Sequence, residues 1–200
     1  MTLVSLWQDR NPRTADLAPE VSGHWDVLVV GGGLTGVTTA LLLGRAGRSV
    51  ALVEADHIGA GTTGRSTAKL SLLQGTQLSS IARKHATSVV ENYVEGNREG
   101  QAWVDRFCGA HGVAVQRRPA CTYANGALGE RRVRAELEAG QQVGLGFQWR
   151  DELPLPYPTR GGVWLEDQLQ VDPMELLTAL TREAVEHGVH VVEGARVQKV

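Results

Sequence analysis

The stretch VLVVGGGLTGVTTALLLGRAGRSVALVE, residues 27–54, decides the fold of this chain. Its first four residues are a continuous apolar run, as in a central parallel strand covered on both faces. A glycine triplet ends that run, and we expect a helix from Leu34 to Ala46 that Gly47 terminates. Residues 49–54 predict a second buried strand. Strand, tight turn, helix and strand in succession make one βαβ unit.

Three glycines of the turn stand in the pattern G-x-G-x-x-G, between the strand and the helix. Gly31 permits the tight turn, Gly33 lets a pyrophosphate approach the backbone, and Gly36 lets the helix pack closely on the strand. The first helical residues, Leu34 and Thr35, add N–H groups and the positive end of the helix dipole. The turn therefore predicts a site for a dinucleotide diphosphate.

An acidic residue follows at the distance that such a site requires. Glu54 ends the second strand, 18 residues beyond Gly36, and Ala55 comes next. A carboxylate at this place can accept hydrogen bonds from both hydroxyls of an adenosine ribose, and it repels the 2′-phosphate of NADP. The alternative is an exposed glutamate at the end of a strand. This pattern does not separate FAD from NAD.

Small and hydroxyl-bearing residues fill the segment where an NAD domain would continue with another strand and helix. Residues 59–68 read GAGTTGRSTA. Backbone N–H groups and hydroxyls of this kind can line a long extended ligand, such as the ribityl diphosphate of a flavin. The hydroxyls are those of Thr62, Thr63, Ser66 and Thr67. On composition alone, a flexible surface turn is the better interpretation.

The whole chain divides into four expected parts. These are an extended lead-in over residues 1–23, a nucleotide-binding core with a helical extension over 24–110, a partial second α+β region over 111–168, and a return to the first domain over 169–200. In the lead-in, Leu3, Leu6 and Trp7 are expected to pack on the domain surface. The next elements are a helix over 79–110, two short strands over 113–116 and 120–123, and a solvent-facing helix over 130–139. A proline-rich connector over 153–158 leads to a strand over 162–165. The last elements are a helix over 173–187 and strands over 189–192 and from Ala195.

Composition excludes several classes of function. The chain has 200 residues, of which 42% are hydrophobic and 21% are charged, as in a protein with a real core. Twenty Lys and Arg against 22 Asp and Glu give a net charge of −2, so we expect no nucleic-acid partner. Cys108 and Cys121 lie in no CxxC motif, which predicts two reduced thiols, no metal site and a cytoplasmic protein. Nothing in the sequence predicts a secretory leader or a membrane span.

A longer stretch carries a resemblance to a known family. Residues 29–71, VVGGGLTGVTTALLLGRAGRSVALVEADHIGAGTTGRSTAKLS, resemble the flavin-binding start of the glycine/D-amino-acid oxidase superfamily. The branch that it resembles most consists of bacterial FAD-dependent oxidoreductases that often carry a C-terminal Rieske domain. Residues 5–7, 67–69 and 153–158 also resemble that branch, so that the likeness runs over residues 5–200.

This resemblance implies an α/β fold: a Rossmann-like FAD-binding βαβ fold with inserted helices and a partial second, substrate-side β region. It implies that the three glycines of the turn face the FAD pyrophosphate and that Glu54 binds the adenosine ribose. The four hydroxyl residues would line the path toward the flavin, and Lys69 would lie near the isoalloxazine or point to solvent. Val197 holds the position at which relatives touch adenine through the main chain.

The resemblance also implies a function. An FAD-dependent oxidoreductase of this kind oxidises a carbon–nitrogen bond of a small amine or amino acid by hydride transfer to the flavin. The second half of such enzymes and the Cys/His spacing of a Rieske centre are absent, so the chain resembles an N-terminal portion truncated at its C-terminus. No catalytic acid or base can be identified, and the electron acceptor stays open. The alternatives are an NAD-linked dehydrogenase or reductase and a catalytically silent fragment.

The histidines give no further lead. His57, His85, His111, His187 and His190 form no recognisable dyad with an acid in the sequence. His187 is better explained as a favourable charge at the C-terminus of a helix.

Overall fold

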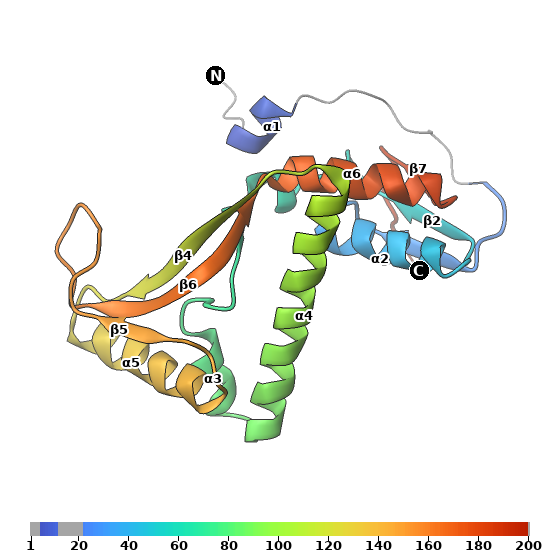
Figure 1. Ribbon diagram of the computed structural model, residues 1–200. Coiled ribbons are helices and arrows are strands. Elements are labelled where there is room, and N and C mark those ends of the chain that lie inside the picture. The colour runs from blue at the N-terminus through green and yellow to red at the C-terminus, as the bar shows by residue number, and fades with distance from the viewer. Residues whose placement is uncertain (1–4, 12–21, 200) are drawn as a thin grey trace. The chain divides into compact units, whose positions relative to one another are not determined.

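The computed structural model describes residues 5–11 and 22–199 (Figure 1). The helices are α1 (Leu6–Arg10), α2 (Leu34–Arg45), the 3-10 helix η1 (Thr63–Arg65), α3 (Gln77–Ala82), α4 (Thr87–His111), α5 (Ala127–Gln142) and α6 (Pro173–Glu186). The strands are β1 (Val27–Val30), β2 (Val50–Val53), β3 (Lys69–Leu70), β4 (Val115–Tyr123), β5 (Gln148–Arg150), β6 (Gly162–Val171) and β7 (His190–Val192).

The chain forms two compact units. The first contains the described residues up to Ala68, His111–Val113, and the chain from Val171 onward. The second contains Lys69–Ala110 and Ala114–Gln170. The helical segment after residue 69 thus belongs with the second unit, whereas the sequence grouped it with the nucleotide-binding core.

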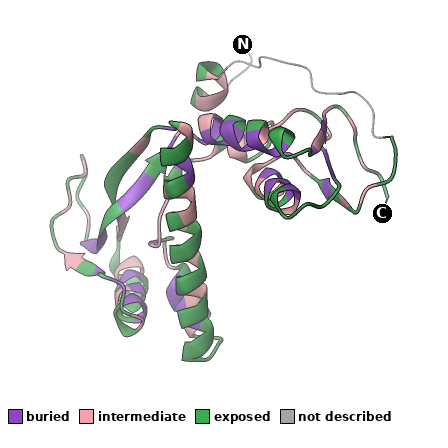
Figure 2. Ribbon diagram, turned by 45° about the vertical axis from the view of Figure 1, so that its right-hand side comes forward, coloured by how far each residue is buried: buried purple, intermediate pink, exposed green. Residues whose placement is uncertain are grey.

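The first unit is built on the predicted βαβ element. Its sheet has the order β1-β2-β7, and all three strands are parallel. Helix α2 connects β1 to β2 and packs against α6, which precedes β7. Figure 2 shows the buried stripes along these two helices. The fully buried side chains of this unit include those of Val37, Leu41, Val50, Leu52, Leu176, Leu177, Leu180 and Val192.

Helix ends in this unit follow the sequence signals. Gly47 has φ +75°, and its amide donates to the Gly44 carbonyl at 2.9 Å as α2 ends. Asp172 caps α6, since its carboxylate accepts from the amides of Met174 at 2.9 Å and Glu175 at 3.3 Å. The predicted helix limits are therefore confirmed to within a residue or two.

Strand β1 departs from expectation on one face. All four residues of β2 are buried, as predicted. On β1, however, Leu28 is 46% exposed and Val30 is 55% exposed. The prediction that β1 is covered on both faces is therefore wrong. The physical reason is that Leu28 and Val30 lie on the face of the strand opposite Val29, and among the described residues only the Val29 face is buried.

The second unit contains an antiparallel sheet with helices on it. The order is β3-β6-β4, and β5 also pairs with β6. Its core gathers side chains from the sheet, α3, α4 and α5, namely Leu73, Leu78, Val90, Val94, Ala120, Ala124, Val133, Ala139, Leu145, Phe147, Val163 and Leu165. Much of α4 outside this core is exposed in Figure 2.

Strand β4 replaces the predicted pair of short strands. The sequence predicted two short strands, at 113–116 and 120–123, with residues 117–119 between them. The structure instead runs one strand through Pro119. Proline cannot donate to a ladder, but β4 is an edge strand, where a missing N–H group is tolerated. The two-strand prediction is therefore wrong.

The predicted helix over 79–110 is broken. Helix α3 ends at Ala82 and α4 begins at Thr87, after the segment 83–86. The polar residues in the middle of α4 have specific partners: Asn97 accepts from Gln74 at 3.0 Å, and Gln101 donates to the Leu70 carbonyl at 2.9 Å. These bonds explain why polar residues interrupt the apolar stripe of this helix.

Helix α5 is longer than the predicted 130–139 and is not solvent-facing throughout. Glu136 is fully buried, and its carboxylate accepts from the amides of Leu78 at 3.0 Å and Ser79 at 2.7 Å. It therefore satisfies two first-turn N–H groups of α3. Arg134 pairs with Glu130 at 3.0 Å and lies over the Trp149 ring at 3.9 Å. The prediction of a wholly solvated face is wrong for Glu136.

The two ends of the described chain also differ from expectation. The lead-in was predicted to be extended, but residues 6–10 form α1. Leu6 is 60% exposed rather than packed, while Trp7 is half-buried. Leu3 lies outside the described residues. Residues 195–197 form no strand; instead the Ala195 amide donates to the Glu54 carbonyl at 2.9 Å.

Candidate functional site

The candidate site is the turn between β1 and α2. Gly31 has φ +107°, which favours glycine, and its amide donates to the Val53 carbonyl at 2.8 Å. A Cβ atom on Gly36 would lie 1.9 Å from the Gly31 carbonyl oxygen, so the first turn of α2 packs directly on the backbone of the strand end. These are the roles that the sequence predicted for Gly31 and Gly36.

The N-terminus of α2 opens from this turn. Gly33 is the N-cap residue and has no side chain to cap the helix. The Leu34 amide instead donates to Oγ1 of Thr63 at 3.1 Å. The Thr63 hydroxyl, which comes from another segment, thus lies where the first-turn N–H groups of α2 point, next to Thr35. Such groups and the helix dipole favour an anion.

Glu54 is fixed beside the turn. One carboxylate oxygen accepts from the Gly32 amide at 2.7 Å, and the other accepts from the Asp56 amide at 2.9 Å. A carboxylate has about four acceptor positions, so two remain beyond these backbone bonds. The acid that the sequence singled out therefore lies next to the glycine turn with acceptor capacity left for a pair of hydroxyls.

The small-residue segment is attached to the same turn. The Gly59 amide donates to the Gly32 carbonyl at 3.0 Å, and η1 follows. Thr62 and Thr67 are exposed, whereas Thr63 and Ser66 are half-buried. The alternative of a flexible surface turn is not supported, since this segment is hydrogen-bonded to the glycine turn.

The segment ends at a strained residue. Ala68 has φ +63° although it is not glycine, and it is 3% exposed. Its amide donates to Oγ of Ser66 at 2.9 Å, and its carbonyl accepts from the Val171 amide at 3.1 Å. The Ser66 amide donates to the Thr63 carbonyl at 3.2 Å, so Thr67 lies between two residues whose backbones are both hydrogen-bonded.

The remaining predicted site residues divide between the units. Ala55 follows Glu54, and the Gly194 amide donates to the Asp56 carbonyl at 2.8 Å. This bond keeps the chain that leads to Val197 beside the end of β2. Lys69, by contrast, belongs to the second unit, where it is exposed and pairs with Gln170.

Sequence reasoning missed two features of the first unit, one at the site and one at the opposite, C-terminal end of α2. The first is α1, whose side chains bond to the small-residue segment. The second is Glu183 on α6, which is 7% exposed and accepts from Arg45 Nε at 2.8 Å. His111 Nε2 lies 2.6 Å from this carboxylate, and His187 Nε2 lies 3.5 Å from it. The sequence showed no dyad for His111 because its acid stands 72 positions away in the chain.

The second unit holds ionisable groups with shifted pKa values. Burial raises the pKa of the Cys121 thiol, and the charges of Arg150 and Lys69 oppose that shift. The hydrogen bond from Tyr157 to Tyr123, 2.9 Å between the hydroxyl oxygens, raises the pKa of Tyr157. Cys108 is buried, and neither cysteine forms a disulfide within the described residues.

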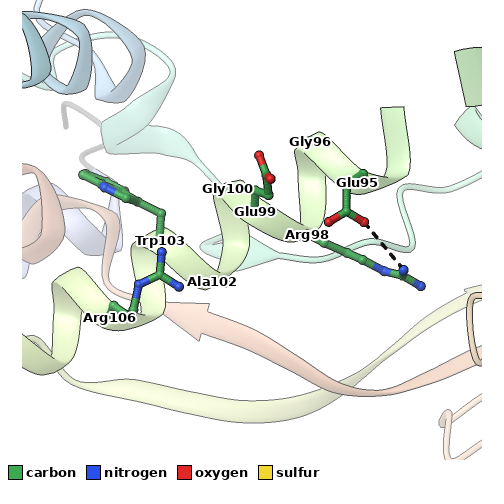
Figure 3. A pocket seen from close by; sticks show the side chains of 8 residues that line it. All are labelled: Glu95, Gly96, Arg98, Glu99, Gly100, Ala102, Trp103 and Arg106. Carbon is green, nitrogen blue, oxygen red and sulfur yellow. Dashed lines mark ion pairs between the residues drawn. The ribbon is translucent and has the colours of Figure 1, made fainter. Parts of the chain in front are cut away.

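A hollow of about 600 Å³ lies along α4 (Figure 3). Glu95 and Arg98 form an ion pair there, with 3.9 Å between Oε2 and Nη1. The residues that line the hollow all come from this one helix: Glu95, Gly96, Arg98, Glu99, Gly100, Ala102, Trp103 and Arg106. It is therefore an open depression on a helix surface, and we assign no ligand to it.

The described residues contain neither a metal-binding cluster nor a membrane-spanning helix. Residues 5–11 and 22–199 contain no group of three or more His, Cys, Asp or Glu side chains that could hold a metal ion. None of the helices in the same ranges combines the length and the apolar character needed to cross a membrane.

Comparison with known proteins adds the family context. A family model described as FAD dependent oxidoreductase (DAO) matches residues 26–200. The Bacillus subtilis (strain 168) protein YhfW, whose name describes a Rieske 2Fe-2S iron–sulfur protein, is 26% identical over 170 residues, which are 84% of this chain and 33% of that protein.

Solved structures share the fold. Glycine oxidase from Geobacillus kaustophilus has a TM-score of 0.68 at 20% identity, covering 86% of this chain and 47% of its own. L-proline dehydrogenase from P. horikoshii has a TM-score of 0.65 at 19% identity, covering 90% and 46%. L-α-glycerophosphate oxidase from Mycoplasma pneumoniae, with FAD bound, has a TM-score of 0.66 at 19% identity, covering 85% and 44%. The chain thus spans less than half of each, and the likeness confirms the predicted α/β fold.

Proposed function

The chain belongs to the FAD dependent oxidoreductase family, and from that premise we propose that its first unit holds the adenosine diphosphate part of FAD at the turn between β1 and α2. The observation that carries this proposal is the open backbone at Gly33, in a turn that the close packing of Gly36 on Gly31 holds together and beside which Glu54 is fixed. FAD is the cofactor of this family.

The residues of the turn fit a diphosphate. Apart from the neighbouring residues in the chain, the only atom of the described residues within 4 Å of a Cβ built on Gly33 is Oγ1 of Thr63, at 3.1 Å, so the backbone is open here apart from one hydroxyl. The amides at the start of α2, those of Leu34 and Thr35, point to the same place. A phosphate oxygen could take the position at which Thr63 now accepts from Leu34, and Thr63 would then donate to that oxygen.

The adenosine end would lie beside β2. Glu54 would accept hydrogen bonds from the ribose hydroxyls with the acceptor positions that its backbone bonds leave. Ala55 and the main chain of Val197 would border the adenine, since the segment from Gly194 is bonded to Glu54 and Asp56. The hydroxyls of Thr62, Thr63, Ser66 and Thr67 would follow the ligand toward the flavin.

The reaction that we propose is oxidation of a carbon–nitrogen bond in an amine or amino acid. FAD supplies the chemistry when bound, because the flavin accepts a hydride from the substrate, while the protein contributes position and electrostatics. Two of the relatives are named for oxidation of glycine and dehydrogenation of L-proline, which supports this substrate class. The second unit would contribute to the substrate side. We leave Lys69 out of the proposed site because it belongs to that unit.

Gly33→Val tests the cofactor site. The valine side chain would fill the space for the diphosphate, so the purified variant should lose the yellow colour and the visible absorption of bound flavin. Gly146→Val is the matched control, because a Cβ at Gly146 meets no atom within 4 Å and the residue is exposed. Equal FAD affinity in Gly33→Val and the native protein, or a native protein that binds NADH and no FAD, would overturn the proposal.

Anaerobic mixing tests the substrate class. Flavin reduction by glycine, L-proline or other amino acids, seen as loss of the visible band, is the expected result. Reduction by glycerol phosphate alone would contradict carbon–nitrogen oxidation while leaving the FAD site in place, since one relative is named for that substrate.

A further inference from the structure

Side chains of α1 and of its N-cap residue Ser5 donate hydrogen bonds to backbone carbonyls of the small-residue segment, residues 59–68. Oγ of Ser5 donates to the Gly64 carbonyl. Nε1 of Trp7 donates to the Ser66 carbonyl at 2.9 Å. These bonds join positions 59 residues apart in the chain. The two donor residues, Ser5 and Trp7, lie before residue 26, where the match to the family model begins.

Several of these contacts are directional. Helix α1 has no fully buried residue, Leu6 is 60% exposed, and Trp7 is half-buried. Nε2 of Gln8 lies 3.5 Å from the Gly59 carbonyl, and Nδ2 of Asn11 donates to the Asp172 carboxylate at 3.0 Å. Within the first unit, the helix is therefore held by hydrogen bonds to specific acceptors together with the partly buried ring of Trp7.

The bond from Trp7 fixes the direction of the next amide. A peptide group is planar and trans, so its carbonyl and its N–H point to opposite sides. When Trp7 holds the Ser66 carbonyl, the N–H of Thr67 is aimed away from α1. Oγ of Ser66 accepts from the Ala68 amide, which fixes the following peptide as well. Thr67 is exposed between these two held peptides.

We propose that residues 5–11 are a brace that positions the amide of Thr67 toward the FAD, with Trp7 as its principal positioning residue. This inference rests on the proposed function for the cofactor, but the brace itself is a property of the protein without FAD. The two parts can therefore be tested separately.

Trp7→Phe is the informative variant because it keeps an aromatic ring and loses the N–H donor. Leu6→Ala, at an exposed position of the same helix, is the control. In the FAD-free protein, trypsin cleavage after the exposed Arg65 should become about threefold to tenfold faster in Trp7→Phe, as expected for the loss of one hydrogen bond. Cleavage after the exposed Arg160 in the second unit should not change.

With FAD, Trp7→Phe should bind about threefold to tenfold more weakly and should shift the visible spectrum of the bound flavin. A purely structural role would weaken binding without changing that spectrum. Native cleavage at Arg65 in Trp7→Phe would overturn the brace. Faster cleavage with native FAD affinity and spectrum would overturn its role toward the cofactor. A native protein that binds no FAD at all would instead refute the proposed function, whatever the cleavage result.

Discussion

Gly36 lies so close to Gly31 that a Cβ atom on Gly36 would stand 1.9 Å from the Gly31 carbonyl oxygen. No backbone can accept that distance, so Gly36→Ala must push α2 away from the end of β1. We expect a loss of about 1–3 kcal/mol in the free energy of unfolding, together with weaker FAD binding. Urea denaturation measures the first and flavin titration the second.

Gly100→Ala is the matched control for that variant. Gly100 lies within α4, and a Cβ there would meet no atom within 4 Å. Because alanine restricts the unfolded chain and favours helix, this variant should be more stable by about 0.5–1 kcal/mol. If both variants lost stability equally, the close packing at Gly36 would not be the cause.

Glu54→Gln should weaken FAD binding by about tenfold and also lower the free energy of unfolding by about 1–3 kcal/mol. The amide keeps one oxygen, so only one of the amides of Gly32 and Asp56 retains its acceptor, and the charge-assisted bonds to the ribose hydroxyls are lost. Isothermal titration with FAD and with flavin mononucleotide separates the effects, because only FAD carries the adenosine. An equal loss of affinity for both ligands would mean that Glu54 does not act through the adenosine ribose.

Glu136→Ala should be strongly destabilising. It leaves the buried amides of Leu78 and Ser79 without their acceptor, at about 1–3 kcal/mol for each. Glu138→Ala, on the exposed face of the same helix, should lie within about 0.5 kcal/mol of the native protein. Thermal denaturation of both variants checks the difference, and similar melting temperatures would show that the cap of α3 contributes little.

The Cys121 thiol should react slowly with iodoacetamide near neutral pH, because burial raises its pKa and keeps it protonated. The raised pKa means that the folded state holds the proton more tightly. The associated stability is present below the ordinary thiol pKa and is lost as the pH rises through the raised value. Arg150→Gln removes a charge that opposes the shift, so alkylation at a fixed alkaline pH, followed by mass spectrometry, should be slower still. Faster alkylation in Arg150→Gln would contradict the role of the Arg150 charge in opposing the raised pKa of Cys121.

Local signals predicted the first unit well. The βαβ element needs only the apolar runs, the glycines and the caps at Gly47 and Asp172, all of which act within a few residues of their own position. The predicted location of Glu54 beside the glycine turn is confirmed for the same reason, because parallel strands bring their carboxyl ends together.

Other features depend on partners far away in the chain. The sequence predicted two strands separated by residues 117–119, and the place of β4 at a sheet edge explains why Pro119 fits one continuous strand. The residues around Glu136 have the pattern of a solvated helix face. Its burial depends on α3, where Ser79 donates to it from 57 positions earlier in the chain. The bond from Trp7 to Ser66 likewise spans 59 positions and leaves no local pattern.

The left-handed backbone of Ala68 has a consequence for sequence variation at this position. With 3% of its surface exposed, there is almost no room beyond the methyl group, and φ +63° penalises every side chain. A saturation library at codon 68, selected for folded protein, should thus return glycine and alanine and reject valine, isoleucine and threonine first.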